Sequence, residues 1–408
     1  MYPKYREIEK FKEEFGSSFY IFSPEQFSSN YESFVCSFQK YYPLTKVAYA
    51  YKANYMPVLG DIVNKHGGMI EVASRLEYDI ALKSIEPKNI IFNGPMKTKE
   101  DLTQAIKLGS IVNVDSFYEL DYIKELLDER EIDSASIGIR INYKIPEHSS
   151  RFGFDINNGE FDKAITIIEQ DNRIHLVAIH SHFTTKKRCL NTFTIRTKKM
   201  VEVYNKLYPR HDIRYIDIGG GFFGGMTPEL IQKYNLEVPT IDQYAKTITS
   251  VLHEEIASPE KPTLVIEPGI SMVANIMHLF AEILEIKKIG NTLYAVCDSS
   301  INVVNPEKSK ITPSYRIISQ NNEPSEKKVT YIIVGNTCLE YDIIIEKHEG
   351  TLKRGDFIMF INKGAYSHVR TPIFIMPRPP IIGREGQIYK EKDSSEYVLE
   401  PYIFETKQ

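Results

Sequence analysis

Several features are scarce or absent in this sequence. It has no tryptophan, and its four cysteines (Cys36, Cys189, Cys297 and Cys338) stand far apart, with no CxxC pair. That spacing gives neither a disulfide framework nor a zinc site, so we expect a reducing compartment, the cytoplasm. No apolar run approaches the ~18 residues that cross a bilayer, and the opening MYPKYREIEKFKEEF is too charged for a signal peptide. These absences exclude a secreted disulfide-rich protein and a membrane protein.

An excess of charge of either sign is also missing. The 408 residues carry 50 basic and 54 acidic side chains, a formal net charge of −4. No broad positive field is therefore available, and we predict no nucleic-acid partner. What the chain does have is an ordinary globular composition, 42% hydrophobic and 25% charged. Its length suggests roughly two or three domains, and an enzyme or binding protein for small molecules remains.

Short apolar runs rich in β-branched residues recur along the first two thirds of the chain. They occupy 47–52, 69–74, 90–95, 111–116, 137–142, 175–182, 215–221 and 263–269. Between them lie amphipathic stretches with helical spacing, such as 99–109 and 116–130. Strands that are apolar on both faces and alternate with helices predict a parallel sheet covered by helices. Eight such units fit a (β/α)8 TIM-like barrel. The alternative is a doubly wound open sheet, although no GxGxxG turn follows the first run.

After about residue 280 the pattern changes to apolar runs separated by short turns, which is typical of antiparallel strands. The segment SFYIFS (18–23) predicts one further strand, and the polar, proline-bearing segment 305–328 predicts a surface loop. We therefore predict an α/β chain. Residues 28–280 form the barrel, and 281–408 form a C-terminal antiparallel β domain that residues 1–27 complete with an N-terminal strand.

In such barrels the functional groups gather where the strands end. The side chains at those ends are, in order, Lys52, Glu71, Asn93, Asp115, Arg140, His180 with His182, the three glycines 219–221, and Glu267. A lysine in an apolar setting can form a Schiff base with an aldehyde. Successive glycines let backbone N–H groups cradle a phosphate. A buried carboxylate can pair with a cationic ring nitrogen.

Each of these features also has a purely structural explanation. Lys52 can be a surface lysine at a strand end, the glycines a tight turn, Glu267 a structural acid, and His182 a packed core histidine. His180 and His182 share a strand face and suggest a metal pair. No further histidine cluster supports such a pair, so we predict no metal site.

Six motifs in a fixed order, YAYKAN, EVASRLE, DIGGGF, EPG, VGNTC and KGAY, carry a family resemblance. They are similar to those of the fold-type III pyridoxal-phosphate decarboxylases, the family of diaminopimelate, ornithine and arginine decarboxylases. The likeness extends from about residue 18 to residue 372. It implies pyridoxal 5′-phosphate as cofactor, α-decarboxylation of an amino acid, and a homodimer with shared active sites.

The resemblance also implies a role for individual residues. Lys52 is the lysine that bonds the cofactor, Glu267 keeps its ring nitrogen protonated, and Cys338 of the second subunit delivers a proton to the substrate carbon. Glu77 matches an acidic position near the cofactor lysine. The implied cofactor-binding residues are Lys52, Glu71, Arg140, His182, Thr185, Gly219, Gly220, Gly221, Glu267, Gly269 and Tyr366. The implied substrate residues are Asp298, Leu339 and Asp342.

The sequence departs from the family where substrate or phosphate is contacted. Ile270 replaces the arginine of EPGR, and Leu339 replaces an acidic residue after the loop cysteine. These changes disfavour diaminopimelate and simple basic amino acids, and favour a larger or conjugated amino acid, as in siderophore or natural-product pathways. The alternatives are a diaminopimelate or basic amino-acid decarboxylase, a racemase of the same fold, and a non-enzymatic regulator. The presence of Lys52 counts against the regulator.

Overall fold

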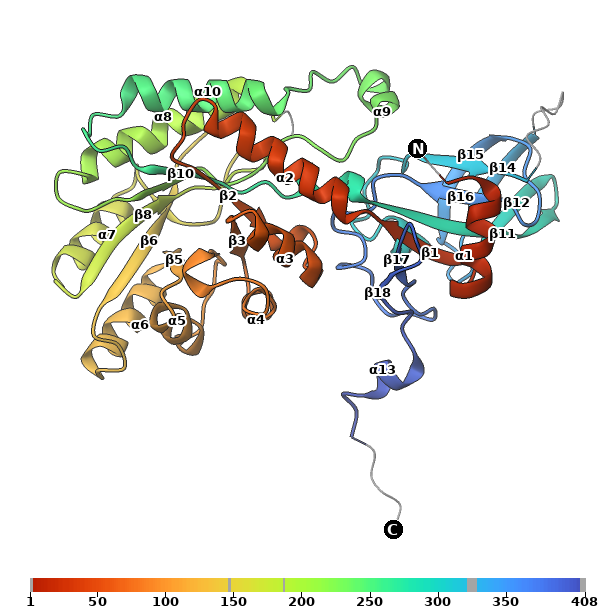
Figure 1. Ribbon diagram of the computed structural model, residues 1–408, viewed down its shortest axis with the longest axis horizontal. Coiled ribbons are helices and arrows are strands. Elements are labelled where there is room, and N and C mark those ends of the chain that lie inside the picture. Colours follow the sequence, from red (N-terminus) through yellow and green to blue (C-terminus); the bar gives the residue numbers. More distant parts are fainter. Residues whose placement is uncertain (1–2, 146–147, 186–187, 321–328, 404–408) are drawn as a thin grey trace, which may run out of the picture. The chain divides into compact units, whose positions relative to one another are not determined.

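The computed structural model describes residues 3–145, 148–185, 188–320 and 329–403. The chain divides into two compact units. One comprises Phe27–Gly224 with Asn235–Met272, and the other comprises Met1–Gln26, Gly225–Tyr234 and Val273–Gln408. The first unit is built on a parallel sheet and the second on a mixed sheet, as Figure 1 shows.

The parallel sheet is a closed barrel. Its strands are β2 (Thr45–Ala50), β3 (Met69–Val72), β4 (Ile90–Phe92), β5 (Ile111–Val114), β6 (Ala135–Asn142), β8 (Ile174–His180), β9 (Tyr215–Asp217) and β10 (Thr263–Ile266). The pairing runs β5-β4-β3-β2-β10-β9-β8-β6, and β6 returns to β5. Each predicted run overlaps one of these strands, so the (β/α)8 barrel is confirmed and the open sheet is wrong. A short strand, β7 (Phe154–Asp155), pairs with the end of β6.

Helices surround the barrel strands (Figure 1). They are α2 (Pro24–Gln39), α3 (Pro57–Lys65), α4 (Arg75–Ala81), α5 (Lys99–Lys107), α6 (Phe117–Asp128), α7 (Glu160–Glu169), α8 (Leu190–Leu207), α10 (Ile241–Glu255) and the short α11 (Ile270–Val273). The predicted helical stretches 99–109 and 116–130 contain α5 and α6. Helix α5 begins where it does because Thr98 and Asp101 form a capping box.

Apolar side chains fill the barrel rather than leaving a pore. A buried cluster takes one residue from each of six strands: Ala48, Met69, Ile91, Ile111, Ala178 and Val265. Short connections in the same unit form single helical turns, η1 (Tyr51–Ala53) after β2 and η2 (Pro87–Asn89) before β4. With the interior packed, polar groups at the carboxyl ends of the strands are left to form the functional surface.

The second unit is a nine-stranded sheet. Its strands are β1 (Ser18–Phe22), β11 (Met277–Ile289), β12 (Thr292–Cys297), β13 (Tyr315–Ile318), β14 (Val329–Val334), β15 (Ile343–Gly350), β16 (Phe357–Phe360), β17 (Ile381–Gly383) and β18 (Ile388–Lys390). β1 pairs with β11, as the N-terminal strand prediction requires. Most pairings are antiparallel, but β1–β17 and β12–β14 are parallel, which makes the sheet mixed. Long crossovers between these strands allow the parallel pairs, whereas a tight turn would not.

The segment 305–328 is more structured than predicted. Its part Tyr315–Ile318 is strand β13, which pairs antiparallel with β16, so the expectation of a surface loop is wrong there. Residues 321–328 lie outside the described residues. The apolar run of this strand, YRII, is only four residues long, and polar residues flank it on both sides, so the sequence pattern did not predict a strand.

Helix α1 (Tyr5–Phe15) packs on this sheet. Ile8 is fully buried in a cluster with Phe19, Phe280 and Phe357, and Phe11 lies against it. The remaining helical segments of the unit are η3 (Ala274–Ile276), α9 (Pro228–Lys233), α12 (Ile301–Val304) and α13 (Ser395–Leu399). Strand and helix from the N-terminus thus contribute to the core of a mostly C-terminal unit.

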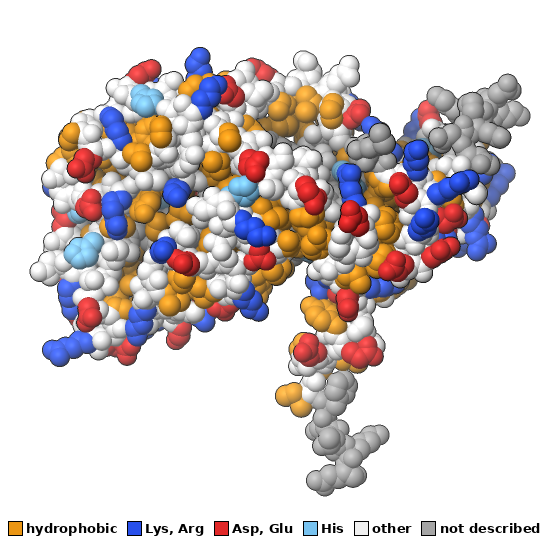
Figure 2. Space-filling model, viewed as in Figure 1, with side chains coloured by type: hydrophobic (Ala, Val, Ile, Leu, Met, Phe, Trp, Pro, Cys, Tyr) orange, Lys and Arg blue, Asp and Glu red, His pale blue; other side chains and the backbone are white. Residues whose placement is uncertain are grey.

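Two surface properties bear on the expected partners. Among the described residues, no helix combines the length and apolarity needed to cross a membrane. On the face shown in Figure 2, basic and acidic side chains are interspersed, in keeping with the small net charge.

Candidate active site

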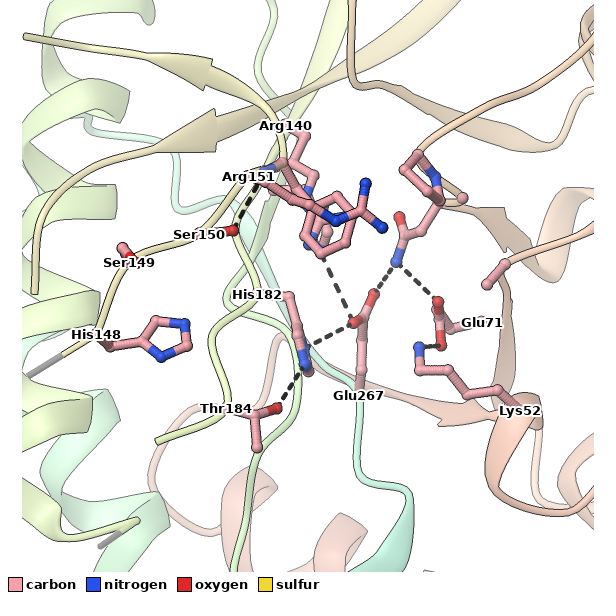
Figure 3. Close-up of a pocket in the computed structure, with 16 residues that line it drawn as sticks. Lys52, Glu71, Arg140, His148, Ser149, Ser150, Arg151, His182, Thr184 and Glu267 are labelled. Atoms are coloured by element: carbon pink, nitrogen blue, oxygen red, sulfur yellow. Dashed lines mark hydrogen bonds and ion pairs between the residues drawn. The ribbon is translucent and has the colours of Figure 1, made fainter. Parts of the chain in front are cut away.

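A cavity of about 590 Å³ opens in the barrel unit where the strands end (Figure 3). Most of its lining residues have polar or charged side chains, and five of them are residues predicted for the site. The lining residues are Lys52, Glu71, Ala73, Asn93, Gly94, Pro95, Arg140, His148, Ser149, Ser150, Arg151, Phe152, His180, His182, Thr184 and Glu267. Six of the eight strands therefore contribute to one pocket, as expected when parallel strands converge at one end of a barrel.

Lys52 offers an accessible amine beside a buried acid. It lies in η1 directly after β2, and its Nζ is 2.5 Å from Glu71 Oε2. The Lys52 side chain is 34% exposed, whereas that of Glu71 is 1% exposed. Burial raises the pKa of Glu71 to about 7, even though the Lys52 charge opposes the rise. This carboxyl group can accordingly exchange a proton with the lysine near neutral pH.

Asn93 links two buried carboxylates across the pocket. Its Nδ2 donates to Glu71 Oε1 at 3.2 Å and to Glu267 Oε1 at 2.6 Å. Asn113 Nδ2 in turn donates to Asn93 Oδ1 at 2.7 Å, which fixes the amide orientation. Strands β3, β4, β5 and β10 are thereby joined by hydrogen bonds between side chains.

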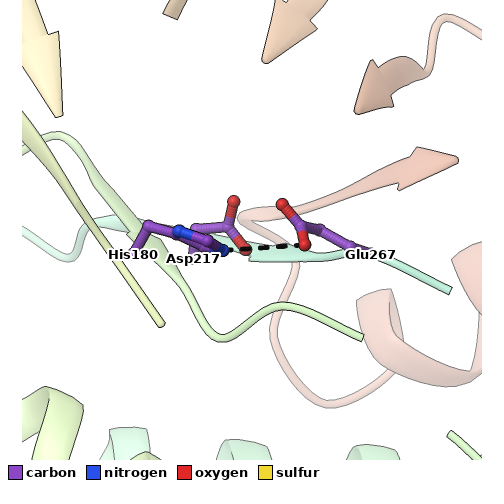
Figure 4. Close-up of side chains that lie close together, drawn as sticks. All are labelled: His180, Asp217 and Glu267. Atoms are coloured by element: carbon purple, nitrogen blue, oxygen red, sulfur yellow. Dashed lines mark ion pairs between the residues drawn. The ribbon is translucent and has the colours of Figure 1, made fainter. Parts of the chain in front are cut away.

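Glu267 lies among buried titratable groups (Figure 4). Its Oε2 is 3.7 Å from His180 Nε2, and Asp217 belongs to the same cluster. Burial raises the pKa of Asp217 well above its ordinary value, and the Glu267 charge adds to the rise. Burial would also raise the pKa of Glu267, but His180 and Lys52 outweigh it and hold this pKa below its ordinary range. Two adjacent buried carboxyls do not both ionise, so Glu267 carries the negative charge.

The glycine loop after β9 contacts the histidine after β8. Gly220 N–H donates to His182 Nδ1 at 3.0 Å, and Thr184 Oγ1 lies 3.1 Å from Nε2. Gly219 and Gly221 have φ of +68° and +91°, and a Cβ on Gly220 would be 2.1 Å from the Glu267 carbonyl oxygen. Only glycine suits this path. Desolvation and the Lys52 charge hold the pKa of His182 well below its ordinary value, so the ring is neutral.

Arg140 is held on the opposite side of the pocket. Its Nη1 is 3.2 Å from Asp115 Oδ2, and Phe152 lies against the guanidinium, with the ring centroid 4.6 Å from Cζ. Asp115 Oδ1 accepts from Gly153 N–H at 3.0 Å. Asp115 therefore anchors both Arg140 and the segment around Gly153.

The site fits the cofactor that the resemblance implies. Glu267 Oε2 is fully buried without a hydrogen-bond donor among the described residues, and a protonated ring nitrogen is a donor of the right charge. Lys52 presents a primary amine in the same pocket. The glycine loop leaves no room for side chains and is of the kind that approaches a phosphate closely.

The model of the pyridoxal-binding domain of pyridoxal-dependent decarboxylases matches residues 29–274. This chain belongs to that family. The decarboxylase is 29% identical to the diaminopimelate decarboxylase of Methanocaldococcus jannaschii, over 87% of this chain and 83% of the relative. It is 26% identical to the diaminopimelate decarboxylase of Aquifex aeolicus, over 97% and 94%.

Solved structures agree with the family assignment. A crystal structure of the M. jannaschii diaminopimelate decarboxylase superposes with a TM-score of 0.85 at 26% identity, covering 98% of this chain and 94% of that chain. The arginine decarboxylase of Paramecium bursaria Chlorella virus shares the fold, with a TM-score of 0.74 at 23% identity, over 90% and 96%. The decarboxylase is thus a pyridoxal-phosphate-dependent carboxy-lyase that acts on an amino acid. The family supports decarboxylation rather than racemisation.

Other predicted site residues lie in the second unit and do not line the barrel pocket. Cys338 is exposed and Leu339 is half-buried. Asp342 is buried, and its carboxylate accepts from Ile301 N–H at 2.6 Å and from Thr337 Oγ1 at 2.5 Å. Asp298 accepts from Ser17 and Asn336, and Tyr366 adopts a φ of 53°. Asp342 and Asp298 therefore hold loops within their own unit.

Six predicted positions of the barrel unit are not among the residues that line the cavity: Glu77, Thr185, Gly219, Gly220, Gly221 and Gly269. Thr185 Oγ1 accepts from Arg188 N–H at 3.3 Å, while the neighbouring Thr184 faces the pocket. Gly269 is half-buried just before α11. Glu77 Oε2 accepts from Ala73 N–H at 2.8 Å, so this acid ties the start of α4 to the end of β3.

Sequence reasoning missed several residues. The segment 148–152 contributes to the pocket, including the exposed Arg151, although it belongs to no predicted strand end. Lys97 is completely buried, with Nζ 2.9 Å from Glu119 Oε1. The signal that was available for Lys97 is its place four residues after Asn93, within reach of the same strand ends. For Arg196 on α8, the sequence of an amphipathic helix offers no such signal.

Proposed function

We propose that this decarboxylase removes the α-carboxyl group of a non-standard amino acid or amino-acid conjugate, with release of CO2 and an amine, as in siderophore or natural-product biosynthesis. One observation carries the proposal. The pocket retains an amine, the acid paired with it, and a buried carboxylate oxygen, Glu267 Oε2, that has no hydrogen-bond partner among the described residues. Ile270 and Leu339 are apolar where the family resemblance predicts charge.

Bound pyridoxal phosphate supplies an aldehyde that captures amines and a ring that withdraws electrons from the α-carbon. We propose that Lys52 Nζ is the protein amine that bonds this aldehyde. Glu71 accepts a proton from Nζ, which an amine must lose before it can act as a nucleophile. Glu267 keeps a proton on the ring nitrogen, because its own charge is retained at neutral pH. The neutral His182 is fixed in orientation by Gly220.

We further propose that Cys338 donates the proton to the substrate carbon, in a homodimer with shared sites in the cytoplasm. Exposure of Cys338 supports this role, because an exposed thiol can enter a site on a second chain. Asp342 would then act by holding the loop through Thr337 and Ile301. The predicted boundaries, 28–280 for the cofactor-binding barrel and 1–27 with 281–408 for the β domain, are part of this proposal.

Diaminopimelate is the second candidate substrate. Two observations favour it: relatives named diaminopimelate decarboxylase align with nearly the whole chain, and Arg151 lines the pocket with an exposed guanidinium. A guanidinium binds a carboxylate in bidentate fashion. Arg151 would then take over the distal carboxylate from the missing arginine at position 270.

The test is a substrate panel with purified holoenzyme, read as CO2 and as amine product by mass. The panel contains meso-diaminopimelate, L-lysine, L-ornithine, L-arginine and Nε- or Nδ-acylated derivatives. The first proposal expects an acylated or larger amino acid to have the highest kcat/KM. Robust turnover of meso-diaminopimelate that falls in Arg151→Met would overturn it in favour of the second candidate. Wild-type protein that binds no pyridoxal phosphate would contradict both.

A further inference from the structure

Helix α8 places a buried cation directly behind the glycine loop. Arg196 is 1% exposed, in the middle of α8. Its Nη1 donates to the Gly220 carbonyl at 3.1 Å, and its Nη2 donates to the Ile218 carbonyl. A Cβ built on Gly221 would be 3.5 Å from Nη1. The guanidinium therefore lies against the loop along its length.

This cation has no anionic partner among the described residues. Its only hydrogen-bond acceptors there are the two neutral carbonyls, and Nε has none. Phe193 covers the guanidinium, with Cζ 4.6 Å from the ring centroid. The carboxyl groups of Glu267 and Asp217 act on it only at longer range, and burial together with the Glu267 charge raises the pKa of Asp217 well above its ordinary value. Burial accordingly lowers the pKa of Arg196.

A buried charge without a counter-ion is costly, and proteins retain one where a ligand compensates for it. Gly219 and Gly220 of the loop are buried, and their N–H groups already donate to Asp217 Oδ1 at 2.8 Å and to His182 Nδ1 at 3.0 Å. Among the described residues, the Gly221 N–H is the loop donor that is left for a ligand. Hydrogen bonds from the guanidinium polarise the loop peptides, which strengthens their N–H groups as donors. The buried positive charge behind the loop and the remaining N–H donor of Gly221 together favour an anion at this place.

We propose that Arg196 is a positioning residue that supplies the buried positive charge for a phosphate monoester bound at the glycine loop. It acts through the loop, not by direct contact with the ligand. The inference deepens the proposed function, on which it rests, since the phosphate in question is that of the cofactor. It assigns a role to a residue that lies outside the pocket lining and outside every motif of the resemblance.

The test compares pyridoxal phosphate with pyridoxal, which lacks the phosphate, in binding to cofactor-free protein. Arg196→Met keeps the length of the side chain and removes its charge. We expect the Kd for pyridoxal phosphate to rise about 10-fold to 100-fold, followed as the absorbance of the lysine-bound aldehyde. The Kd for pyridoxal should change less than about 2-fold. Cofactor-free Arg196→Met should unfold at the same or a higher temperature than wild type, because an uncompensated charge is gone.

Lys198→Met is the matched control. It removes a positive charge from the same helix at an exposed position, where Nζ is 2.8 Å from Glu255 Oε1. In this control neither the Kd for pyridoxal phosphate nor the Kd for pyridoxal should change. That result would show that the effect of Arg196→Met comes from the position of its charge and not from the net charge of the protein. Should Arg196→Met fail to fold, Arg196→Lys takes its place, with an intermediate loss of affinity for pyridoxal phosphate expected and pyridoxal again unaffected.

A measurement on wild-type protein provides a second arm. Inorganic phosphate should raise the melting temperature of the cofactor-free protein and tighten its binding of pyridoxal. Equal loss of affinity for pyridoxal and pyridoxal phosphate in the Arg196 variants would overturn the inference, as would a wild-type protein indifferent to phosphate. If wild type binds no pyridoxal phosphate, the proposed function itself fails. If it binds but the variants match it, only the role of Arg196 fails.

Discussion

The barrel pocket and the 335–342 loop of the β unit hold their candidate functional groups in different ways. In the pocket, Lys52, Glu71, Asn93 and Glu267 are joined by hydrogen bonds between strands, and three of the four are buried. In the loop, the buried Asp342 holds the backbone, while Cys338 is exposed. The groups proposed to hold the cofactor are thus placed at strand ends, and the proposed proton donor, Cys338, lies on a loop.

This difference has a physical basis. A strand end is fixed by backbone pairing on both sides, so a side chain there varies little in position. A loop held at one buried carboxylate can change its exposed residues without loss of the fold. We therefore expect substitutions in the pocket to remove function or stability, and substitutions in the loop to alter rate and specificity.

The largest effect is expected for Lys52→Ala. Loss of the amine that contacts Glu71 should remove the proposed covalent bond to the cofactor, and turnover should fall at least ~10³-fold. The measurement is CO2 release together with the absorbance of bound cofactor. Lys46→Ala, an exposed residue on β2 of the same barrel, is the control and should leave both unchanged. If Lys52→Ala retained turnover, the proposal that the barrel pocket is the cofactor site would be wrong.

Lys97→Met tests how far the pocket depends on buried pairing. Lys97 Nζ contacts Glu119 Oε1 and donates to the carbonyls of Asn93, Gly94 and Asn113. Removing the lysine leaves the Glu119 charge buried without its partner, and the free energy of unfolding should fall by about 3–5 kcal/mol. Urea denaturation of cofactor-free protein provides the value.

Lys99→Met is the matched control for that experiment, two residues along the chain. Lys99 pairs with Glu125 and Glu129 at exposed positions, so its loss should hardly change stability. Equal stability of the two variants would show that the ends of β4 and β5 do not need the buried ion pair.

Cys338→Ala addresses the loop side of the comparison. Without its proposed proton donor the decarboxylase should slow by about 10²-fold or release altered products, while the absorbance of bound cofactor persists. Cys36→Ala, another exposed cysteine, should behave as wild type. Unchanged kcat and product in Cys338→Ala would remove the loop from the chemistry.

Sharing of sites between chains can be tested with the same variants. Equal amounts of Lys52→Ala and Cys338→Ala protein, mixed and allowed to exchange subunits, form mixed dimers in which one site has both residues. Activity should return to about one quarter of wild type, since half of the dimers are mixed and half of their sites are intact. Activity that stays at the level of the separate variants would contradict a site built from two chains.

The smallest effect concerns the pH dependence of stability. Burial raises the pKa of Glu71 from 4.5 to about 7, so the folded protein retains a proton that the unfolded chain releases. The contribution of this group to the free energy of unfolding therefore falls as the pH rises through that window. Cofactor-free wild type should lose stability relative to Glu71→Gln between about pH 5 and pH 7. Parallel pH profiles for the two proteins would show that Glu71 titrates normally.

Much of the barrel was predictable from the sequence. Runs apolar on both faces mark parallel strands, and their positions placed Lys52, Glu71, Arg140, His182 and Glu267 at one end of the barrel, where the pocket lies. This succeeds because strand ends follow directly from local hydrophobic pattern. The strand β13 was missed because four residues between polar flanks resemble a loop, and only pairing with β16 stabilises them.

What the sequence by itself determined is the order of strands and helices, the residues at the strand ends, and through six short motifs the family. Tertiary structure alone decided which of those residues touch, because hydrogen bonds such as Asn93 to Glu267 join positions far apart in the chain. It also decided the burial of Lys97 and Arg196. The local sequence pattern places both charged residues in solvent. The free-energy cost of burying them can be judged only from the structure, which pairs Lys97 with Glu119 and leaves Arg196 Nε without a hydrogen-bond partner among the described residues.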